Sequence, residues 1–217
     1  MGDFKLYSYY RSSCSYRVRI ALNLKGIVYE YIPLHLVNEG GEQHLPAYRT
    51  INPKREVPTL VHGPFTLSQS MAIIEYLDQF KPSPQLFPKD KQKRALVTQF
   101  CEIINSGIQP IQNLSVLQEL KSRFAASEAD IQTWCADWIF RGFEGIEAML
   151  RDHAGSHCFG GTITAADLFL VPQVYNAQRF KVDLSTFPII DRVSKNAMAI
   201  DSFQLAEPSR QIDAPRT

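Results

Sequence analysis

The spacing of hydrophobic residues predicts a strand, a helix and a second strand at the start of the chain. Residues 4–10 form a short, aromatic-rich run that predicts a strand. Residues 16–26 carry apolar side chains at helical spacing, and Gly26 stands where a helix would end. Residues 27–36 are rich in β-branched and aromatic side chains and predict another strand. Together they predict a βαβ unit with parallel strands.

A second group of elements follows a polar segment. Residues 38–53 are punctuated by glycine and proline and predict a loop with at most one weak helix. Residues 57–62 and 65–67 predict an antiparallel hairpin around a Gly-Pro turn. Residues 70–80 have apolar side chains on one helical face, so a helix is expected there.

The pattern changes after this helix, which divides the chain into two domains. We expect residues 1–81 to form an α/β domain, residues 82–93 a proline-rich linker, and residues 94–217 an all-helical domain. Pro172 is expected to kink one of the helices. The helices are predicted near residues 91–106, 110–124, 128–152, 164–180 and 188–201, followed by an irregular tail.

Composition excludes several classes of function. The net charge of +1 offers no basic surplus for nucleic acid or an anionic membrane. No apolar run approaches the roughly 20 residues of a membrane span, and no secretory signal is expected. The 4 cysteines are widely spaced without a CxxC pair, which favours the reducing cytoplasm. His153, His157 and Cys158 lie close together but lack a second ligand pair, so no metal site is expected.

Three small polar residues, Ser12, Ser13 and Cys14, stand at the start of the first predicted helix. They are either helix-capping residues or a site for a thiolate. A free thiol has a pKa of about 8.5, and lowering it by two units takes about 2.7 kcal/mol. A hydroxyl hydrogen bond to a charged acceptor supplies about 1.5–3 kcal/mol, and a helix N-terminus about 0.3–1 kcal/mol. One serine at this position could therefore hold a bound thiolate near neutrality.

Two further positions carry candidate binding groups. A cis bond between Val57 and Pro58 would leave the main chain of Val57 able to pair with an extended peptide, although cis is the minority state. Gln69 and Ser70 stand where a strand meets a helix, and N–H groups at such a helix start bind carboxylates. Ser70 could equally be only an N-cap.

These motifs, taken in order, resemble the glutathione transferase family over nearly the whole chain. The stretch "SSCSYRVRIAL" is similar to the serine-and-cysteine signature of the zeta class, which includes maleylacetoacetate isomerases. The stretches "GIQPIQNLSVL" and "ADLFLVPQVYNAQRFKVDL" also resemble that class. The resemblance implies an N-terminal thioredoxin-like βαβ-ββα domain followed by a C-terminal helical domain.

The resemblance also implies glutathione as the cofactor. It places Ser12 as the hydroxyl that stabilises the thiolate, with Ser13 and Cys14 beside it as the catalytic group. It implies that Gln109 and Arg179 bind the substrate, although Arg179 read alone is a solvated charge at a helix end. The implied glutathione-binding residues are Ser12, Ser13, Cys14, Arg17, Gln43, Val57, Pro58, Gln69, Ser70, Asn113 and Ser115.

The activity implied is glutathione-dependent cis–trans isomerisation of maleylacetoacetate to fumarylacetoacetate in phenylalanine and tyrosine breakdown, by a cytoplasmic homodimer. Three alternatives use the same site: conjugation or dehalogenation of electrophiles such as α-halo acids, isomerisation of maleylpyruvate, and thiol–disulfide exchange at Cys14. An alternative of another class is a non-catalytic interaction module with this fold.

Overall fold

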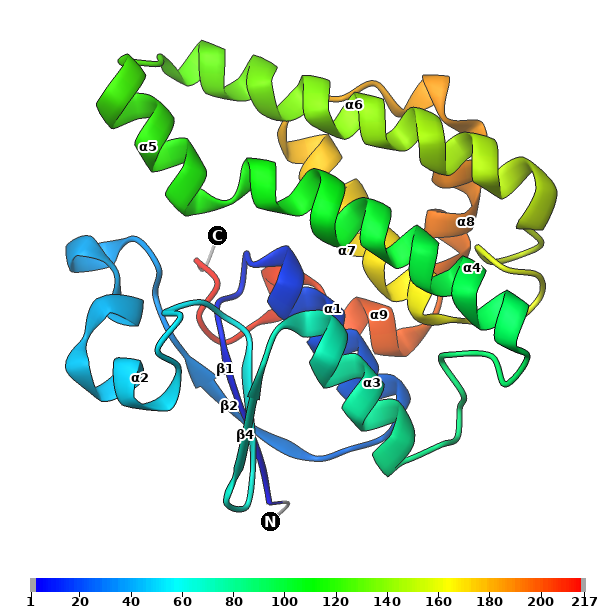
Figure 1. The fold of residues 1–217 in the computed structure, drawn as a ribbon, viewed down its shortest axis with the longest axis horizontal. Helices are drawn as coiled ribbons and strands as arrows, with labels where there is room; N and C mark the ends of the chain where they lie inside the picture. Colours follow the sequence, from blue (N-terminus) through cyan, green and yellow to red (C-terminus); the bar gives the residue numbers. More distant parts are fainter. Residues whose placement is uncertain (1–2, 216–217) are drawn as a thin grey trace. The chain divides into compact units, whose positions relative to one another are not determined.

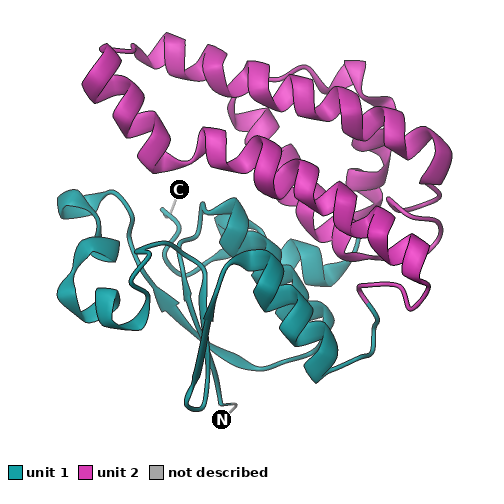
Figure 2. Cartoon of the chain, viewed as in Figure 1, with its two compact units in different colours: residues 1–85, 199–217 teal, residues 86–198 magenta. Residues whose placement is uncertain are grey.

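The computed structural model describes residues 3–215, which form two compact units (Figure 2). The first unit contains residues 3–85 and 199–215, and the second contains residues 86–198. None of the helices in the described part of the chain is long and apolar enough to cross a membrane.

The first unit is a mixed four-stranded sheet with helices, as predicted for the α/β part (Figure 1). The strand order is β2-β1-β3-β4, with β1 parallel to β2 and antiparallel to β3, and β3 antiparallel to β4. Helix α1 packs against α3 and α9. Its elements are β1 (Phe4–Ser8), α1 (Ser13–Leu24), β2 (Tyr29–Pro33), α2 (Pro46–Ile51), β3 (Thr59–His62), β4 (Phe65–Ser68), α3 (Ser70–Phe80) and α9 (Asp201–Ala206).

The end of α1 confirms the predicted stop at Gly26. The Ile27 N–H donates to the Leu22 carbonyl and the Gly26 N–H to the Asn23 carbonyl, each at 3.0 Å. Gly26 has a φ of 55°, which glycine adopts without steric cost. These bonds form a Schellman motif, so the glycine ends the helix and turns the chain toward β2.

A buried lysine joins the far ends of α1 and α3. The Lys25 ammonium donates to the Asp78 carboxylate at 2.6 Å and to the main-chain carbonyls of Lys81 at 2.7 Å and Pro84 at 2.6 Å. The Lys25 side chain is fully buried. Three acceptors therefore compensate for the loss of water around this charge.

The second unit is all helical, with α7 at its centre. Every residue of α7 from Ala165 to Ala177 is buried except Tyr175, and α7 packs against α4 and α8. The predicted helix near 91–106 ends as an α-helix at residue 102 and continues as a π-helical segment over 103–108. Its helices are α4 (Lys91–Glu102), α5 (Leu114–Phe124), α6 (Glu128–His153), α7 (Ala165–Arg179) and α8 (Pro188–Met198).

The compact units differ from the predicted domain boundaries at both ends of the helical domain. The helix predicted near 188–201 corresponds to α8, and a further helix that was not predicted, α9, follows it. Helix α9 belongs to the first unit, where Arg19 Nε donates to the Ala206 carbonyl at 3.0 Å. Within the predicted linker 82–93, Leu86 and Phe87 are fully buried and belong to the second unit. Apolar burial and main-chain hydrogen bonds, rather than proline content, set these boundaries.

Candidate active site

The turn between β1 and α1 places Ser12 at the N-cap of α1. The Ser12 N–H donates to the Tyr9 carbonyl at 3.0 Å. The Ser12 Oγ accepts a hydrogen bond from the Ser15 N–H at 3.2 Å. Capping uses only an acceptor site of the hydroxyl, and its proton is still available to donate to another group. The capping and thiolate-binding interpretations of Ser12 are therefore compatible.

Ser13 and Cys14 are the first two residues of α1. Ser13 is buried, and Cys14 is half-buried with a free thiol. Because N–H groups in a first helical turn have no intrahelical partner, the end of α1 carries a partial positive charge. Together with the Ser12 hydroxyl, it offers hydrogen-bond donors and a favourable field for one anion.

The Val57–Pro58 peptide bond is cis, as the resemblance implied. The segment before it is held by two side chains: the Tyr48 hydroxyl donates to the Glu56 carbonyl at 2.6 Å, and Asn52 Nδ2 donates to the same oxygen at 2.8 Å. Burial raises the pKa of the Tyr48 hydroxyl above its ordinary value. None of the hydrogen bonds among residues 3–215 uses the main-chain N–H or C=O of Val57.

Ser70 and Arg17 meet at the start of α3. Gln69, not Ser70, is the N-cap residue, so the N-cap interpretation of Ser70 is wrong. The Ser70 Oγ instead accepts a hydrogen bond from a terminal nitrogen of the buried Arg17 guanidinium at 3.1 Å. A guanidinium and a helix N-terminus in one place favour a carboxylate.

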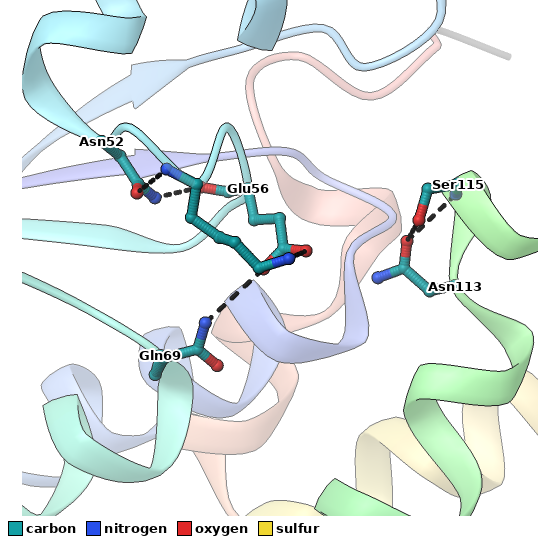
Figure 3. Close-up of polar contacts among 6 residues, drawn as sticks. Asn52, Glu56, Gln69, Asn113 and Ser115 are labelled. Atoms are coloured by element: carbon teal, nitrogen blue, oxygen red, sulfur yellow. Dashed lines mark hydrogen bonds and ion pairs between the residues drawn. The ribbon is translucent and has the colours of Figure 1, made fainter.

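Gln69 has a strained backbone and an exposed side chain. Its φ of 73° lies in a region that non-glycine residues rarely adopt, at a cost of about 1–3 kcal/mol. Gln69 Nε2 donates to the Glu56 carboxylate at 3.5 Å (Figure 3). The same carboxylate pairs with Lys54 Nζ at 3.2 Å. Strain of this kind is found at ligand clamps, where the surrounding structure holds the backbone in place.

Gln43 is buried in the short turn Glu42–His44. Its Nε2 donates to the Leu36 carbonyl at 3.2 Å. Its Oε1 is buried and has no hydrogen-bond partner among the described residues. A buried acceptor without a partner is costly, so this oxygen suits an N–H donor from a ligand.

The second unit carries the remaining predicted residues. Asn113 caps α5, and its Oδ1 accepts hydrogen bonds from the Ser115 N–H at 3.1 Å and the Ser115 hydroxyl at 3.0 Å (Figure 3). Gln109 is half-buried in the short helical segment Gln109–Gln112.

Arg179 is exposed in the last turn of α7. Its guanidinium donates to Asn176 Oδ1 at 3.2 Å and lies 5.1 Å from the ring centre of Phe180. Burial raises the pKa of Cys135 on α6 to about 11, and the positive charge of Arg179 opposes this rise.

Comparisons with known proteins agree with this geometry. Residues 6–85 match the family model described as glutathione S-transferase, N-terminal domain. The chain is 47% identical over 214 residues to maleylacetoacetate isomerase from Rattus norvegicus, covering 99% of this chain and 96% of the rat protein. The chain belongs to the zeta class of the glutathione transferase family.

Solved structures confirm the predicted fold of this glutathione transferase. A bacterial maleylpyruvate isomerase of the zeta class superposes with a TM-score of 0.94 at 43% identity, covering 97% of this chain and 100% of that one. A maleylacetoacetate isomerase from Anaeromyxobacter dehalogenans, with glutathione bound in its active site, superposes with a TM-score of 0.88 at 42% identity. The latter comparison covers 98% of each chain.

The glutathione transferase fold brings together part of the predicted set within the first unit. The structure joins Arg17 to Ser70 directly, and it places Ser12, Ser13 and Cys14 at one helix start. Tyr48 and Asn52, which hold the segment before the cis bond, were not predicted from the sequence. Their acceptor is a main-chain carbonyl, and a main-chain carbonyl leaves no signal in the pattern of side chains.

Proposed function

We propose that this zeta-class glutathione transferase converts maleylacetoacetate to fumarylacetoacetate with glutathione as a covalent catalyst. The observation that carries the proposal is Ser12: its hydroxyl caps α1 as an acceptor and still has a proton to donate at the positive end of that helix. The names of curated relatives support the substrate, since rat and mouse maleylacetoacetate isomerases are 47% and 48% identical to this chain.

The residues of the first unit fit the peptide part of glutathione. The Arg17–Ser70 pair and the start of α3 suit the γ-glutamyl carboxylate. The free main-chain groups of Val57 suit the cysteinyl backbone, and the buried Oε1 of Gln43 suits an N–H near the glycine end. The family resemblance also implies Asn113 and Ser115 as glutathione-binding residues.

When bound, glutathione would supply the thiolate nucleophile. Its addition to the cis double bond would move the π electrons into the conjugated carbonyl and leave a single bond that can rotate, and its departure would return those electrons and form the trans alkene. The chain keeps the sulfur deprotonated through the Ser12 hydroxyl and the α1 terminus. Arg179 holds a carboxylate of the substrate, and Gln109 contributes to the same pocket. No atom of glutathione is consumed, so free thiol is constant over the reaction.

The experiment gives the purified protein maleylacetoacetate with and without glutathione and follows both isomers and free thiol. We expect the trans product to form only with glutathione, at constant thiol. Stoichiometric loss of thiol would contradict the isomerase and favour conjugation. Absence of any conversion together with absence of glutathione binding would favour the non-catalytic interaction module.

Maleylpyruvate is the second candidate substrate, because the zeta-class structure that superposes at a TM-score of 0.94 is a maleylpyruvate isomerase. Both substrates are acidic cis enones, so the same residues serve either one. We expect a higher kcat/KM for maleylacetoacetate when the two are compared, and the reverse ratio would reassign the substrate.

We propose a cytoplasmic homodimer as the working form. The four cysteines, which all lie within residues 3–215, form no disulfide, which suits a reducing compartment. The homodimer rests on the family resemblance. Sedimentation analysis tests it: a mass twice that of the chain is expected, and a monomer would contradict it.

A further inference from the structure

The C-terminal segment of the first unit reaches the turn that leads into α1. The Asp213 carboxylate accepts a hydrogen bond from the Tyr10 N–H at 2.9 Å through one oxygen. Its other oxygen accepts from the Tyr31 hydroxyl on β2 at 2.7 Å. Figure 1 shows this segment, in red, returning beside the start of the chain's first helix. One side chain near the end of the chain thus ties β2 to the β1–α1 turn.

A buried arginine fixes the same turn from the other side. The terminal nitrogens of Arg19 donate to the Ser8 hydroxyl at 3.2 Å, the Tyr9 carbonyl at 3.4 Å and the Tyr10 carbonyl at 3.0 Å. Arg19 Nε donates to the Ala206 carbonyl at 3.0 Å. The Tyr10 carbonyl is held by Arg19, and the Tyr10 N–H is held by Asp213.

These contacts set the position of Ser12. Tyr10 precedes Ser12 by two residues, and the Ser12 N–H donates to the carbonyl of Tyr9 at 3.0 Å. We propose that Asp213 is a positioning residue, which fixes the Tyr9–Tyr10 peptide and thereby aims the Ser12 hydroxyl at the sulfur of glutathione. This role rests on the proposed function of the turn and adds a contribution from the far end of the chain.

The charge of Asp213 and its hydrogen bonds are expected to have opposite effects on the stability of the glutathione thiolate. The Tyr31 hydroxyl donates to Asp213. The negative charge of Asp213 also favours the protonated forms of Arg19 and Tyr9, since it acts to raise the pKa of each. A carboxylate disfavours a nearby thiolate by charge alone. Loss of its charge would therefore favour the thiolate, whereas loss of its hydrogen bonds would let the turn move and disfavour the thiolate.

The experiment compares full-length Asp213→Ala and Asp213→Asn with the unmodified protein. Asn keeps an acceptor for the Tyr10 N–H and removes the charge, whereas Ala removes both. The readouts are the pKa of bound glutathione, from thiolate absorbance against pH, and kcat and KM for isomerisation. Ile212→Ala is the matched control, because the neighbouring Ile212 side chain is 77% exposed.

For Asp213→Ala we expect the thiolate fraction at neutral pH to fall about three- to tenfold, since each pKa unit is a tenfold change. We expect kcat to fall in parallel and to recover at alkaline pH, while KM for glutathione changes less than twofold. Asp213→Asn and Ile212→Ala should stay within about twofold of the unmodified protein in thiolate fraction.

Several results would overturn the proposal. An unchanged pH profile in a folded Asp213→Ala variant would show that the contact is only structural. A thiolate fraction that rises in both Asp213 variants would show that only the charge matters. If Asp213→Ala does not fold, Tyr31→Phe replaces it, and an unshifted thiol pKa in that variant refutes the positioning role. If the unmodified protein shows no bound thiolate, the proposed function itself fails.

Discussion

Substitution of Ser12 separates its two proposed roles. As an N-cap, its Oγ accepts from the Ser15 N–H at 3.2 Å. As a thiolate donor, its O–H proton would bind the sulfur of glutathione. Ala removes both interactions, Gly removes the hydroxyl but is itself a good N-cap residue, and Thr keeps both. Comparison of these three variants therefore separates the effect of the cap from the effect of the hydroxyl on the thiolate.

The magnitudes of the two effects differ. Loss of the cap in Ser12→Ala is expected to lower the free energy of unfolding by about 1 kcal/mol, and Ser12→Gly by only a few tenths. Loss of a hydrogen bond to a charged acceptor costs about 1.5–3 kcal/mol, which corresponds to a rise of about 1–2 units in the pKa of bound glutathione. This rise is expected in both Ala and Gly variants, and Thr should stay near the unmodified protein.

The assays are urea unfolding for stability and ultraviolet absorbance of the thiolate, titrated against pH with saturating glutathione. An unshifted thiol pKa of glutathione bound to Ser12→Gly would refute the role of Ser12 as a thiolate donor. A thiol pKa that follows stability across the three variants would also refute it, because the hydroxyl would then act only as a cap.

Three further predictions address stability, substrate binding and the cysteine. Asp78→Ala should lower the free energy of unfolding by about 3 kcal/mol, because it leaves the Lys25 ammonium buried with only carbonyl partners; a loss below about 1 kcal/mol in urea unfolding would contradict this. Arg179→Ala should raise KM for acidic substrates about tenfold with little change in KM for glutathione, with Arg179→Lys as the control that keeps the charge; an unchanged substrate KM would remove the proposed clamp. Cys14→Ala should keep isomerase activity within about threefold, whereas complete loss would favour obligatory thiol exchange.

Side-chain periodicity and turn residues predict the elements whose bounds depend on local sequence. Apolar spacing over residues 16–26 and a glycine at 26 were enough to predict α1 and its end. The boundary after α8 could not be found in this way. The predicted helix near 188–201 has no strong breaker, and the assignment of α9 to the first unit depends on contacts such as Arg19 to the Ala206 carbonyl.

The same limit applies to the candidate site. Ser12 was predictable because a capping serine precedes an amphipathic run. The cis Val57–Pro58 bond was implied only by family resemblance, since most such bonds are trans. Asp213 lies 203 residues from its partner Tyr10, in a tail predicted to be irregular. No local pattern connects an aspartate to a main-chain N–H at that separation, so only the folded chain reveals the contact.

The decisive experiment is a structure of this protein with bound glutathione. We expect the glutathione sulfur to lie within hydrogen-bonding distance of the Ser12 Oγ, at the start of α1, with the cysteinyl backbone paired to Val57. A sulfur that binds elsewhere, or that points away from the hydroxyls of Ser12 and Ser13, would contradict it.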